Sequence, residues 1–282
     1  MKLSSLLFIT LWLAACAQVK PVWVNTTDLK TPESALYSPA FKTIFVSNIN
    51  GDPTAKDGNG YIAMLNDKGR ALASPWVEGL NAPKGMAIAN KILFVTDIDT
   101  LVSIDIEKST ISNKWVVPGS KFLNDVAAAP DGTIYFSDMM DNAIYVLKNN
   151  AVELFIKDNA LEAPNGLFVK DNKLFVATWG IITEGFATSK TGRIITIDLA
   201  SKAITPYMSD KPIGNLDGLE FVDDGFFVSD WMVGKIFKGN SAGKIKQILD
   251  LGQGAADIGI IPDTKILLVP QMITNELKAY SY

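Results

Sequence analysis

An all-β fold built from six similar four-stranded units is what this sequence predicts, on three observations. A short strand motif recurs six times, a second motif precedes it by about ten residues in each copy, and no amphipathic helical stretch competes with them. Short strands in groups of four, repeated at intervals of roughly 40 to 50 residues, are typical of a six-bladed β-propeller. A β-sandwich is the alternative, but it does not explain a two-part repeat in six copies.

The two motifs define the units. The strand motif is an apolar and aromatic run that in its clearest copies ends in Ser or Thr followed by Asp, and its copies begin at Ile44, Leu93, Ile134, Leu174, Phe226 and, more weakly, Ile266. The earlier motif places a polar residue before a small or acidic one and an apolar one. Its copies are Pro32–Ala35, Pro83–Met86, Leu123–Val126, Pro164–Leu167, Leu216–Leu219 and Ala255–Ile258.

The remaining elements follow in chain order. A turn separates the two motifs, most clearly at 129–132 and 222–225. Alternating apolar and polar residues, as in 192–198, then predict half-buried outer strands. The sixth unit has room for only three strands, near 256–261, 265–269 and 275–281. We therefore expect residues 21–24 to supply its fourth strand, which closes the ring and leaves no exposed edge.

The N-terminal segment has the pattern of an export signal. Lys2 precedes an apolar run over residues 3–15 that is too short to span a bilayer, which predicts a signal peptide over residues 1–15. The stretch 13–16 resembles a bacterial lipobox, so we expect Cys16 to be lipidated, residues 16–20 to form a short linker and residues 21–282 to form the propeller. Ala17 is not the Asp that retains lipoproteins at the inner membrane. The expected location is the periplasmic side of the outer membrane of a Gram-negative cell, or the periplasm or medium if Cys16 is incidental.

Composition limits the chemistry. A net charge of −4 with 26 Lys and Arg and no basic cluster argues against nucleic acid as a partner. The sequence has no His, the commonest general base and transition-metal ligand, and its only Cys is Cys16. Chemistry must therefore use carboxylates, amides, Lys, hydroxyls or a bound hard cation. A propeller with closed edges has no need to oligomerise, so we expect a monomer whose only membrane contact is its lipid anchor.

A ring of side chains is expected at the mouth of the central channel, if the earlier motif begins the innermost strand of each blade. Its members are Glu33, Lys84, Asn124, Asn165, Asp217 and Ala256. Two carboxylates and two amides in a channel of low dielectric suit Ca²⁺ or Mg²⁺, and without a cation the two carboxylates would repel one another. Each residue alone also fits a turn former or a solvated strand end, but together in one ring they favour a metal site.

The segments around these residues resemble, in order, the four marker segments of the gluconolactonase/regucalcin family. The resemblance extends over essentially the whole mature chain. It implies that Glu33, Asn165 and Asp217 bind one metal, usually calcium, and that Asn124 contacts the metal or the substrate. It also implies that Asp217 acts as base or nucleophile. The expected activity is hydrolysis of a small-molecule lactone or related ester.

Two positions depart from the family pattern. Lys84 occupies the ring position of blade two, where its ammonium would either compete with the cation or steady the oxyanion of the substrate. Family members that act on sugar lactones carry Arg two residues before the third-blade Asn, and here that residue is Phe122, with Lys121 beside it. Recognition of a sugar acid is therefore not expected.

Two long loops, 48–60 in blade one and 179–192 in blade four, should flank the mouth from opposite sides. Apolar residues expected on this rim predict a substrate with an apolar portion, although the Met residues fit packing between blades equally well. The rim residues are Trp179, Met139, Trp231, Met140, Met232, Ile181, Ile182 and Phe186.

Other functions fit parts of the sequence. A non-catalytic propeller lipoprotein that binds a ligand or protein through its mouth is the main alternative, because propellers host both uses. A quinone-dependent sugar dehydrogenase is disfavoured, since such sites rely on His. Asp97, Asp138 and Asp230, which end the strand motif, are expected to cap turns and to have no catalytic role.

Overall fold

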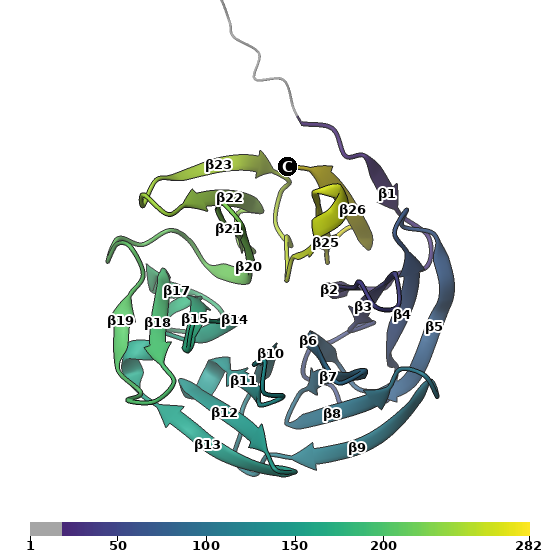
Figure 1. Ribbon diagram of the computed structural model, residues 1–282, viewed down its shortest axis with the longest axis horizontal. Coiled ribbons are helices and arrows are strands. Elements are labelled where there is room, and N and C mark those ends of the chain that lie inside the picture. Colours follow the sequence, from purple (N-terminus) through teal and green to yellow (C-terminus); the bar gives the residue numbers. More distant parts are fainter. Residues whose placement is uncertain (1–18) are drawn as a thin grey trace, which may run out of the picture.

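Six four-stranded antiparallel sheets are arranged in a ring around a common axis in the computed structural model, which describes residues 19–282 (Figure 1). The predicted six-bladed β-propeller is confirmed. Residues 1–18, with the predicted signal peptide and Cys16, lie outside the described residues. Among residues 19–282 no helix has the length and apolar character needed to span a bilayer.

In each of the first five blades the strands follow the chain from the channel outward. The inner and second strands are β2 (Pro32–Ser38) and β3 (Thr43–Asn48), β6 (Pro83–Ala89) and β7 (Ile92–Asp97), β10 (Leu123–Ala128) and β11 (Ile134–Asp138), β14 (Pro164–Lys170) and β15 (Lys173–Thr178), and β20 (Leu216–Val222) and β21 (Gly225–Asp230). The third and outer strands are β4 (Gly60–Asn66) and β5 (Ala71–Leu80), β8 (Thr100–Asp105) and β9 (Thr110–Val116), β12 (Ala143–Lys148) and β13 (Ala151–Lys157), β18 (Ile194–Asp198) and β19 (Ile204–Pro206), and β22 (Lys235–Asn240) and β23 (Ile245–Asp250).

The sixth blade joins both ends of the described chain, as predicted. It consists of β24 (Gly259–Ile261), β25 (Ile266–Gln271), β26 (Glu276–Ser281) and, outermost, β1 (Trp23–Asn25), in which Trp23 lies opposite Ala279. The inner strand begins at Gly259, three residues later than expected. The residues just before Gly259 do not belong to the inner strand. Among them, Asp257 instead forms a β-bridge with Ser34 of blade one.

The register of β1 also shows at which face of the propeller the described chain begins. Strand β26 runs away from the mouth, since its first residue pairs with the last residue of β25. The antiparallel β1 therefore runs toward the mouth and enters from the opposite face, where Val19 and Tyr282 line the same surface pocket.

A β-bulge interrupts the inner strand at the ring motif in each of the first five blades. In β14, for example, Pro164 pairs with Thr178 and the next paired residue is Leu167, so Asn165 and Gly166 have no partners in the ladder. The same break lies between Pro32 and Ala35 and at the equivalent places in β6, β10 and β20. Bulges redirect side chains out of the regular alternation, and here they release the ring residues toward the channel.

Hydroxyl groups at the end of the second strand satisfy backbone groups that these bulges free. Ser137 accepts a hydrogen bond from the Asp125 N–H at 2.9 Å and donates to the Asn165 carbonyl of the next blade at 3.0 Å. Ser229 likewise accepts from the Gly218 N–H and donates to the Ala256 carbonyl, both at 2.8 Å. The recurring Ser of the strand motif thus joins each of these blades to the next.

The Asp that follows this hydroxyl residue caps backbone N–H groups, as expected. Asp138 accepts from the N–H groups of Lys121 and Phe122 in the segment that enters its own blade. Asp97 does the same in blade two, and Asp230 caps the turn that follows it.

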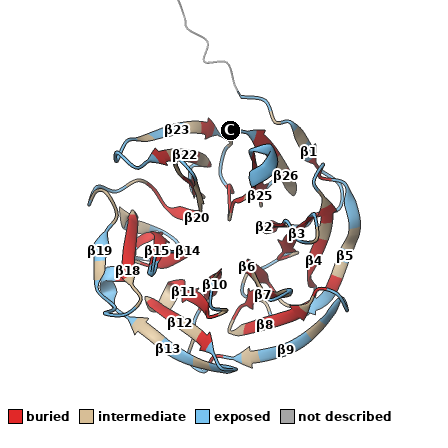
Figure 2. Cartoon of the chain, viewed as in Figure 1, coloured by how far each residue is buried: buried red, intermediate tan, exposed pale blue. Residues whose placement is uncertain are grey.

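Packing between blades accounts for the apolar part of the strand motif. The inner three strands of each blade are largely buried and the outer strands are largely exposed (Figure 2). Phe45, Phe136, Phe226 and Phe227 have no exposed surface. Burying such side chains between neighbouring blades stabilises the ring through the hydrophobic effect and aromatic packing.

Candidate functional site

A pocket of about 250 Å³ opens where the inner strands begin, and it brings together all five polar ring residues that the sequence predicted. Glu33, Lys84, Asn124, Asn165 and Asp217 line it from five different blades, and each is buried. The sixth ring member, Ala256, is buried but does not line the pocket. The pocket is therefore a polar floor at the top of the channel, built by the bulges described above.

Three of the floor residues each carry a buried oxygen without a hydrogen-bond partner. These atoms are Glu33 Oε2, Asn165 Oδ1 and Asp217 Oδ1. Buried polar atoms in folded proteins nearly always have partners, so three unpaired oxygens in one pocket call for an explanation. Carboxylate and amide oxygens are the ligands that a hard divalent cation prefers, and these residues fit one.

The two buried carboxyl groups of the floor also favour a bound cation. Burial raises the pKa of the Glu33 carboxyl well above its ordinary value, and the neighbouring Asp217 raises it further. Burial likewise raises the pKa of Asp217, with a further contribution from Asp257. Within residues 19–282 no cluster of three or more His, Cys, Asp or Glu side chains has metal-binding geometry. The candidate set is two carboxylates and one amide, so water or substrate would complete the coordination.

Lys84 is held away from an ion pair by other partners. Its ammonium donates to the carbonyls of Ala82 at 2.9 Å and Pro53 at 3.1 Å and lies 4.6 Å from the centre of the Phe122 ring. Burial lowers its pKa to about 8, and Glu33 opposes that shift. The ammonium is thus positioned beside the carboxylates by two carbonyls and an aromatic face.

Asn124 lines the same pocket, but its side-chain amide is in contact with the apolar wall. Its side-chain nitrogen contacts the sulfur of Met139 at 3.7 Å. The amide is therefore turned by the apolar wall, and its oxygen is the group left to face a ligand.

A second acidic layer lies below the floor, and the sequence analysis did not identify it. The Asp257 carboxylate accepts a hydrogen bond from the Ser34 hydroxyl at 2.5 Å, and Asp125 accepts from the backbone N–H groups of Val126 and Leu167. Burial raises the pKa of Asp257 to about 7. Both acids directly follow a ring position. The pairs 124–125 and 256–257 are therefore the sequence feature that could have identified this layer.

This layer opens toward the far face. Ser34, Asp125, Asp257 and Glu220 line a second cavity of about 180 Å³ formed by the inner strands. The channel therefore has acidic side chains along much of its length, with Lys84 at its upper end.

The apolar wall of the pocket contains three of the rim residues predicted from the sequence. Trp179, Met139 and Trp231 all line it, with the Trp179 and Trp231 rings 6.0 Å apart and Met139 buried. Phe186 also lines the pocket, 5.9 Å from the Trp179 ring. Ile181 and Met232 lie outside it and are exposed. Sequence reasoning missed Met272 and Ile49 and noted Phe122 only as a departure from the family pattern.

Both predicted long loops reach the mouth. Gly51 and Pro53 of the blade-one loop line the pocket. The blade-four loop contains a hairpin of its own, β16 (Gly180–Ile182) and β17 (Thr188–Thr191), which carries Phe186. Trp179 Nε1 donates to the Phe186 carbonyl at 2.9 Å, so the hairpin folds over the tryptophan.

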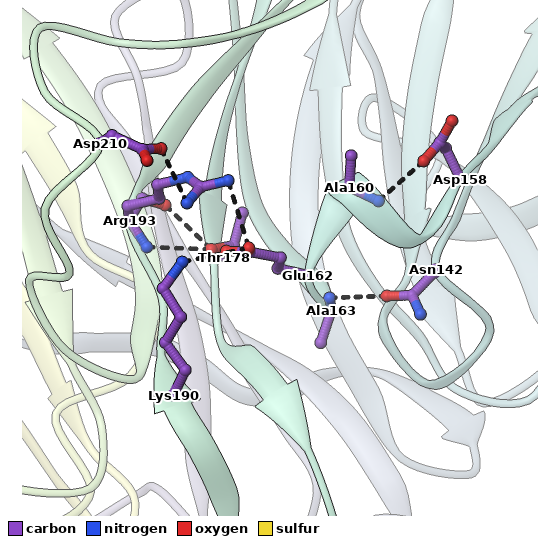
Figure 3. A network of polar contacts seen from close by, with 9 residues as sticks. All are labelled: Asn142, Asp158, Ala160, Glu162, Ala163, Thr178, Lys190, Arg193 and Asp210. Carbon is purple, nitrogen blue, oxygen red and sulfur yellow. Dashed lines mark hydrogen bonds and ion pairs between the residues drawn. The ribbon is translucent and has the colours of Figure 1, made fainter.

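An ion-pair network centred on Arg193 and Glu162 lies beside this hairpin (Figure 3). Arg193 contacts Glu162 at 3.2 Å and Asp210 at 2.9 Å, and both Arg193 and Glu162 are largely buried. The carbonyls of Glu162 and Ala163 accept hydrogen bonds from the N–H groups of Gly180 and Trp179. The network therefore fixes the backbone from which Trp179 projects into the pocket.

Comparison with known proteins establishes the architecture. The sequence matches no protein-family model and no curated protein. The structure is similar to that of a gluconolactonase from Xanthomonas campestris, with a TM-score of 0.69, 14% identity and 93% of each chain covered. It is also similar to a streptogramin B lyase, with a TM-score of 0.62, 12% identity and coverage of 91% of this chain and 96% of that one.

A third similar structure is a catalytically inactive histidine-to-alanine form of virginiamycin B lyase from Staphylococcus aureus with quinupristin. The TM-score is 0.60 at 14% identity, over 92% of this chain and 98% of the lyase. At such identities the likeness shows the fold alone.

Proposed function

We propose that this protein is a metal-dependent hydrolase that opens lactones or cleaves related esters, with Ca²⁺ as the metal. The observation that carries the proposal is the convergence of three unpaired buried oxygens, from Glu33, Asn165 and Asp217, on a pocket whose walls are apolar. A hard cation satisfies all three oxygens and offsets the repulsion between the two carboxylates.

The residues of the floor have distinct roles in this proposal. Glu33, Asn165 and Asp217 hold the cation, which when bound polarises a carbonyl and lowers the pKa of water. Asp217 serves as base or nucleophile, and the side-chain oxygen of Asn124 contacts the metal or a donor group of the substrate. The ammonium of Lys84, held by two carbonyls beside the floor, stabilises negative charge that develops on the carbonyl oxygen.

The walls favour a substrate with an apolar portion over a free sugar. Trp179, Trp231, Met139 and Phe122 surround the space above the floor. Phe122 takes the place of the Arg expected in sugar-lactone enzymes and stacks against Lys84. Apolar walls also exclude water from the reacting groups.

Two of the similar structures bear on the choice of reaction. One is named a gluconolactonase, which supports hydrolysis of a lactone. The virginiamycin B lyase is inactive when a histidine is replaced by alanine, and the present sequence contains no histidine. Chemistry by carboxylate and metal is therefore favoured over that lyase reaction.

A non-catalytic binding propeller is the second candidate, and Lys84 favours it. Its ammonium opposes the rise in pKa that burial causes at the Glu33 carboxyl, as a bound cation would. A floor whose negative charge Lys84 partly offsets binds a ligand without needing a metal.

For location we propose export and lipidation at Cys16, on the sequence pattern alone. The described chain begins on the face opposite the mouth, at Val19. An anchor attached a few residues earlier leaves the mouth open to solutes.

Thermal unfolding tests the proposal directly. The thermal unfolding midpoint of residues 17–282 is measured with calcium, with magnesium and with a chelator. The same measurements are made on Glu33→Gln and, as a control, on Glu153→Gln, which lies on the exposed outer strand β13. Binding to the folded state raises the unfolding midpoint, by about 2.7 kcal/mol of stability at a hundredfold excess over Kd. We expect a calcium-dependent rise that Glu33→Gln abolishes and Glu153→Gln retains, together with lactone or ester hydrolysis that chelation stops. No shift with any metal would favour the binding propeller.

A further inference from the structure

We infer that the substrate carries a long aliphatic chain, and that this chain leaves the pocket over blades four to six. The inference rests on the proposed function for the position of the polar head, at the floor of Glu33, Asn165 and Asp217. The direction and the length of the chain come from a separate observation, the distribution of apolar side chains around the mouth.

The charged and amide side chains that line the pocket are confined to its floor. Above them the walls consist of large apolar side chains, and these are Ile49, Phe122, Met139, Trp179, Phe186, Trp231 and Met272. Such walls favour the burial of apolar groups and offer few partners to a hydroxylated substrate.

Outside the pocket, most of the exposed apolar side chains near the mouth lie on one side, and the exception is Val116 at the mouth end of β9 in blade two. Those on the one side belong to the mouth-side segments of blades four, five and six, and they are Ile181, Phe186, Met232, Val233 and Ile273. Ile273 is the most exposed of them, at 61%. Large apolar side chains gathered at the edge of a binding pocket indicate that a ligand or partner covers them.

Hydrogen bonds join these segments into one continuous surface. Gly254 donates its N–H to the Trp231 carbonyl at 2.8 Å and accepts from the Met272 N–H at 3.0 Å. The Trp231 indole N–H points to the Met272 sulfur at 2.9 Å. Ile273 directly follows Met272 of the pocket wall, and the rings of Trp179 and Trp231 lie 6.0 Å apart, so the apolar wall leads from Trp179 through Trp231 and Met272 to Ile273.

The opposite side of the mouth is polar. The blade-one loop presents Asp52, Lys56, Asp57 and Asn59, and Lys56 forms an ion pair with Asp99 of blade two at 2.5 Å. An aliphatic chain that leaves the floor therefore gains more apolar contacts toward blades four to six than toward the blade-one loop. We name the path Trp179, Trp231, Met272 and Ile273 the apolar track.

The track predicts a dependence on chain length. Each buried methylene contributes about 0.8 kcal/mol, which corresponds to about a fourfold gain in affinity. The gain should continue while the chain lengthens along the track and should stop once the chain passes Ile273.

The experiment uses a series of lactones with straight alkyl chains of increasing length, and the matching lactams, which resist hydrolysis. Turnover is measured on the lactones, and binding of the lactams is followed by the fluorescence of Trp179 and Trp231. The test variant is Ile273→Asp. Leu154→Asp is the matched control, because Leu154 is 52% exposed but lies on the outer strand β13, away from the mouth.

We expect kcat/KM and lactam affinity to rise about fourfold per methylene in the wild type and in Leu154→Asp. Ile273→Asp should remove the gain for the longest chains and leave the shortest unchanged. Lactones hydrolysed without any dependence on chain length, or two variants that behave alike, would overturn the inference while the proposed function stands. Chain-dependent lactam binding without hydrolysis supports the inference while the proposed function fails.

The exposed end of the apolar track could instead be covered by a second copy of the chain. Analytical ultracentrifugation over a range of protein concentrations measures whether the protein is a monomer or a dimer. A monomer in both wild type and Ile273→Asp is the result expected from the inference. A dimer that Ile273→Asp dissociates would assign the exposed end of the track to a protein interface and overturn the inference.

Discussion

Replacing Gly166 with alanine tests how the candidate metal site is held together. Gly166 is the second residue of the blade-four bulge, directly after Asn165. A Cβ added there would lie 2.0 Å from the carbonyl oxygen of Asp217, on the neighbouring inner strand. That backbone must move by at least about 1 Å before the contact reaches the 3.0 Å that Cβ atoms keep.

Two effects follow from this displacement. Overpacking costs about 1 to 3 kcal/mol of stability, or a fall of roughly 2 to 12 °C in Tm for a chain of this size. The move also carries Asp217 away from Asn165, and metal coordination tolerates only about 0.2 Å of error in a ligand distance. We expect the calcium Kd to rise about 10- to 100-fold.

Gly239→Ala separates these two effects. Its added Cβ would also lie 2.0 Å from an atom, here Cζ of the buried Phe226, but on strand β22 away from the floor. Isothermal titration with calcium and thermal unfolding with a chelator are the measurements. Both variants should lose similar stability, and only Gly166→Ala should lose affinity. Equal affinity in both variants would refute the argument that the close approach of β14 and β20 sets the site.

Three further predictions concern single side chains. Asp217→Asn should reduce kcat by about 100-fold or more and should keep or raise the metal-free Tm, because burial raises the pKa of this carboxyl and the amide carries no charge. Retained turnover would exclude the proposed role. Burial also raises the pKa of Glu220, so the folded state holds its proton at pH values where the unfolded chain has lost it. Metal-free stability should therefore fall as pH rises from about 4 toward neutral, and less steeply in Glu220→Gln; identical pH profiles would contradict this. Ser137→Ala leaves the Asp125 N–H without its partner and should cost about 1 to 3 kcal/mol by chemical denaturation, whereas a cost under about 0.5 kcal/mol would show that another group replaces the hydroxyl.

The outcome for Lys84 shows where local reasoning stops. The sequence placed its ammonium in the ring and left open whether it competes with a cation or assists a substrate. In the structure the side chain turns toward two carbonyls, of which Pro53 belongs to the blade-one loop. No periodicity encodes a contact between residues from different blades, so its role depends on a loop conformation that the motif does not describe.

The second acidic layer is a similar case. Asp125 and Asp257 follow ring positions, and regular strand alternation would turn them away from their neighbours in the ring. The bulge in β10 and the bridge from Asp257 to Ser34 bring both into the channel. The sequence shows that positions 125 and 257 are acidic, but it does not show that their side chains point into the channel.

The sequence by itself determined the six-bladed architecture, the closure of the ring by the N-terminal strand, and the five polar residues at the mouth. These rest on local signals, because each repeat contains its own turns and its own apolar run, the Ser or Thr and Asp caps recur in the clearest copies, and repetition of one unit dictates a ring. The tertiary structure alone decided that the oxygens of Glu33, Asn165 and Asp217 lack partners, and that most exposed apolar side chains near the mouth lie over blades four to six. Both depend on where side chains distant in sequence meet after the blades pack, which is a property of the closed ring and not of any single repeat.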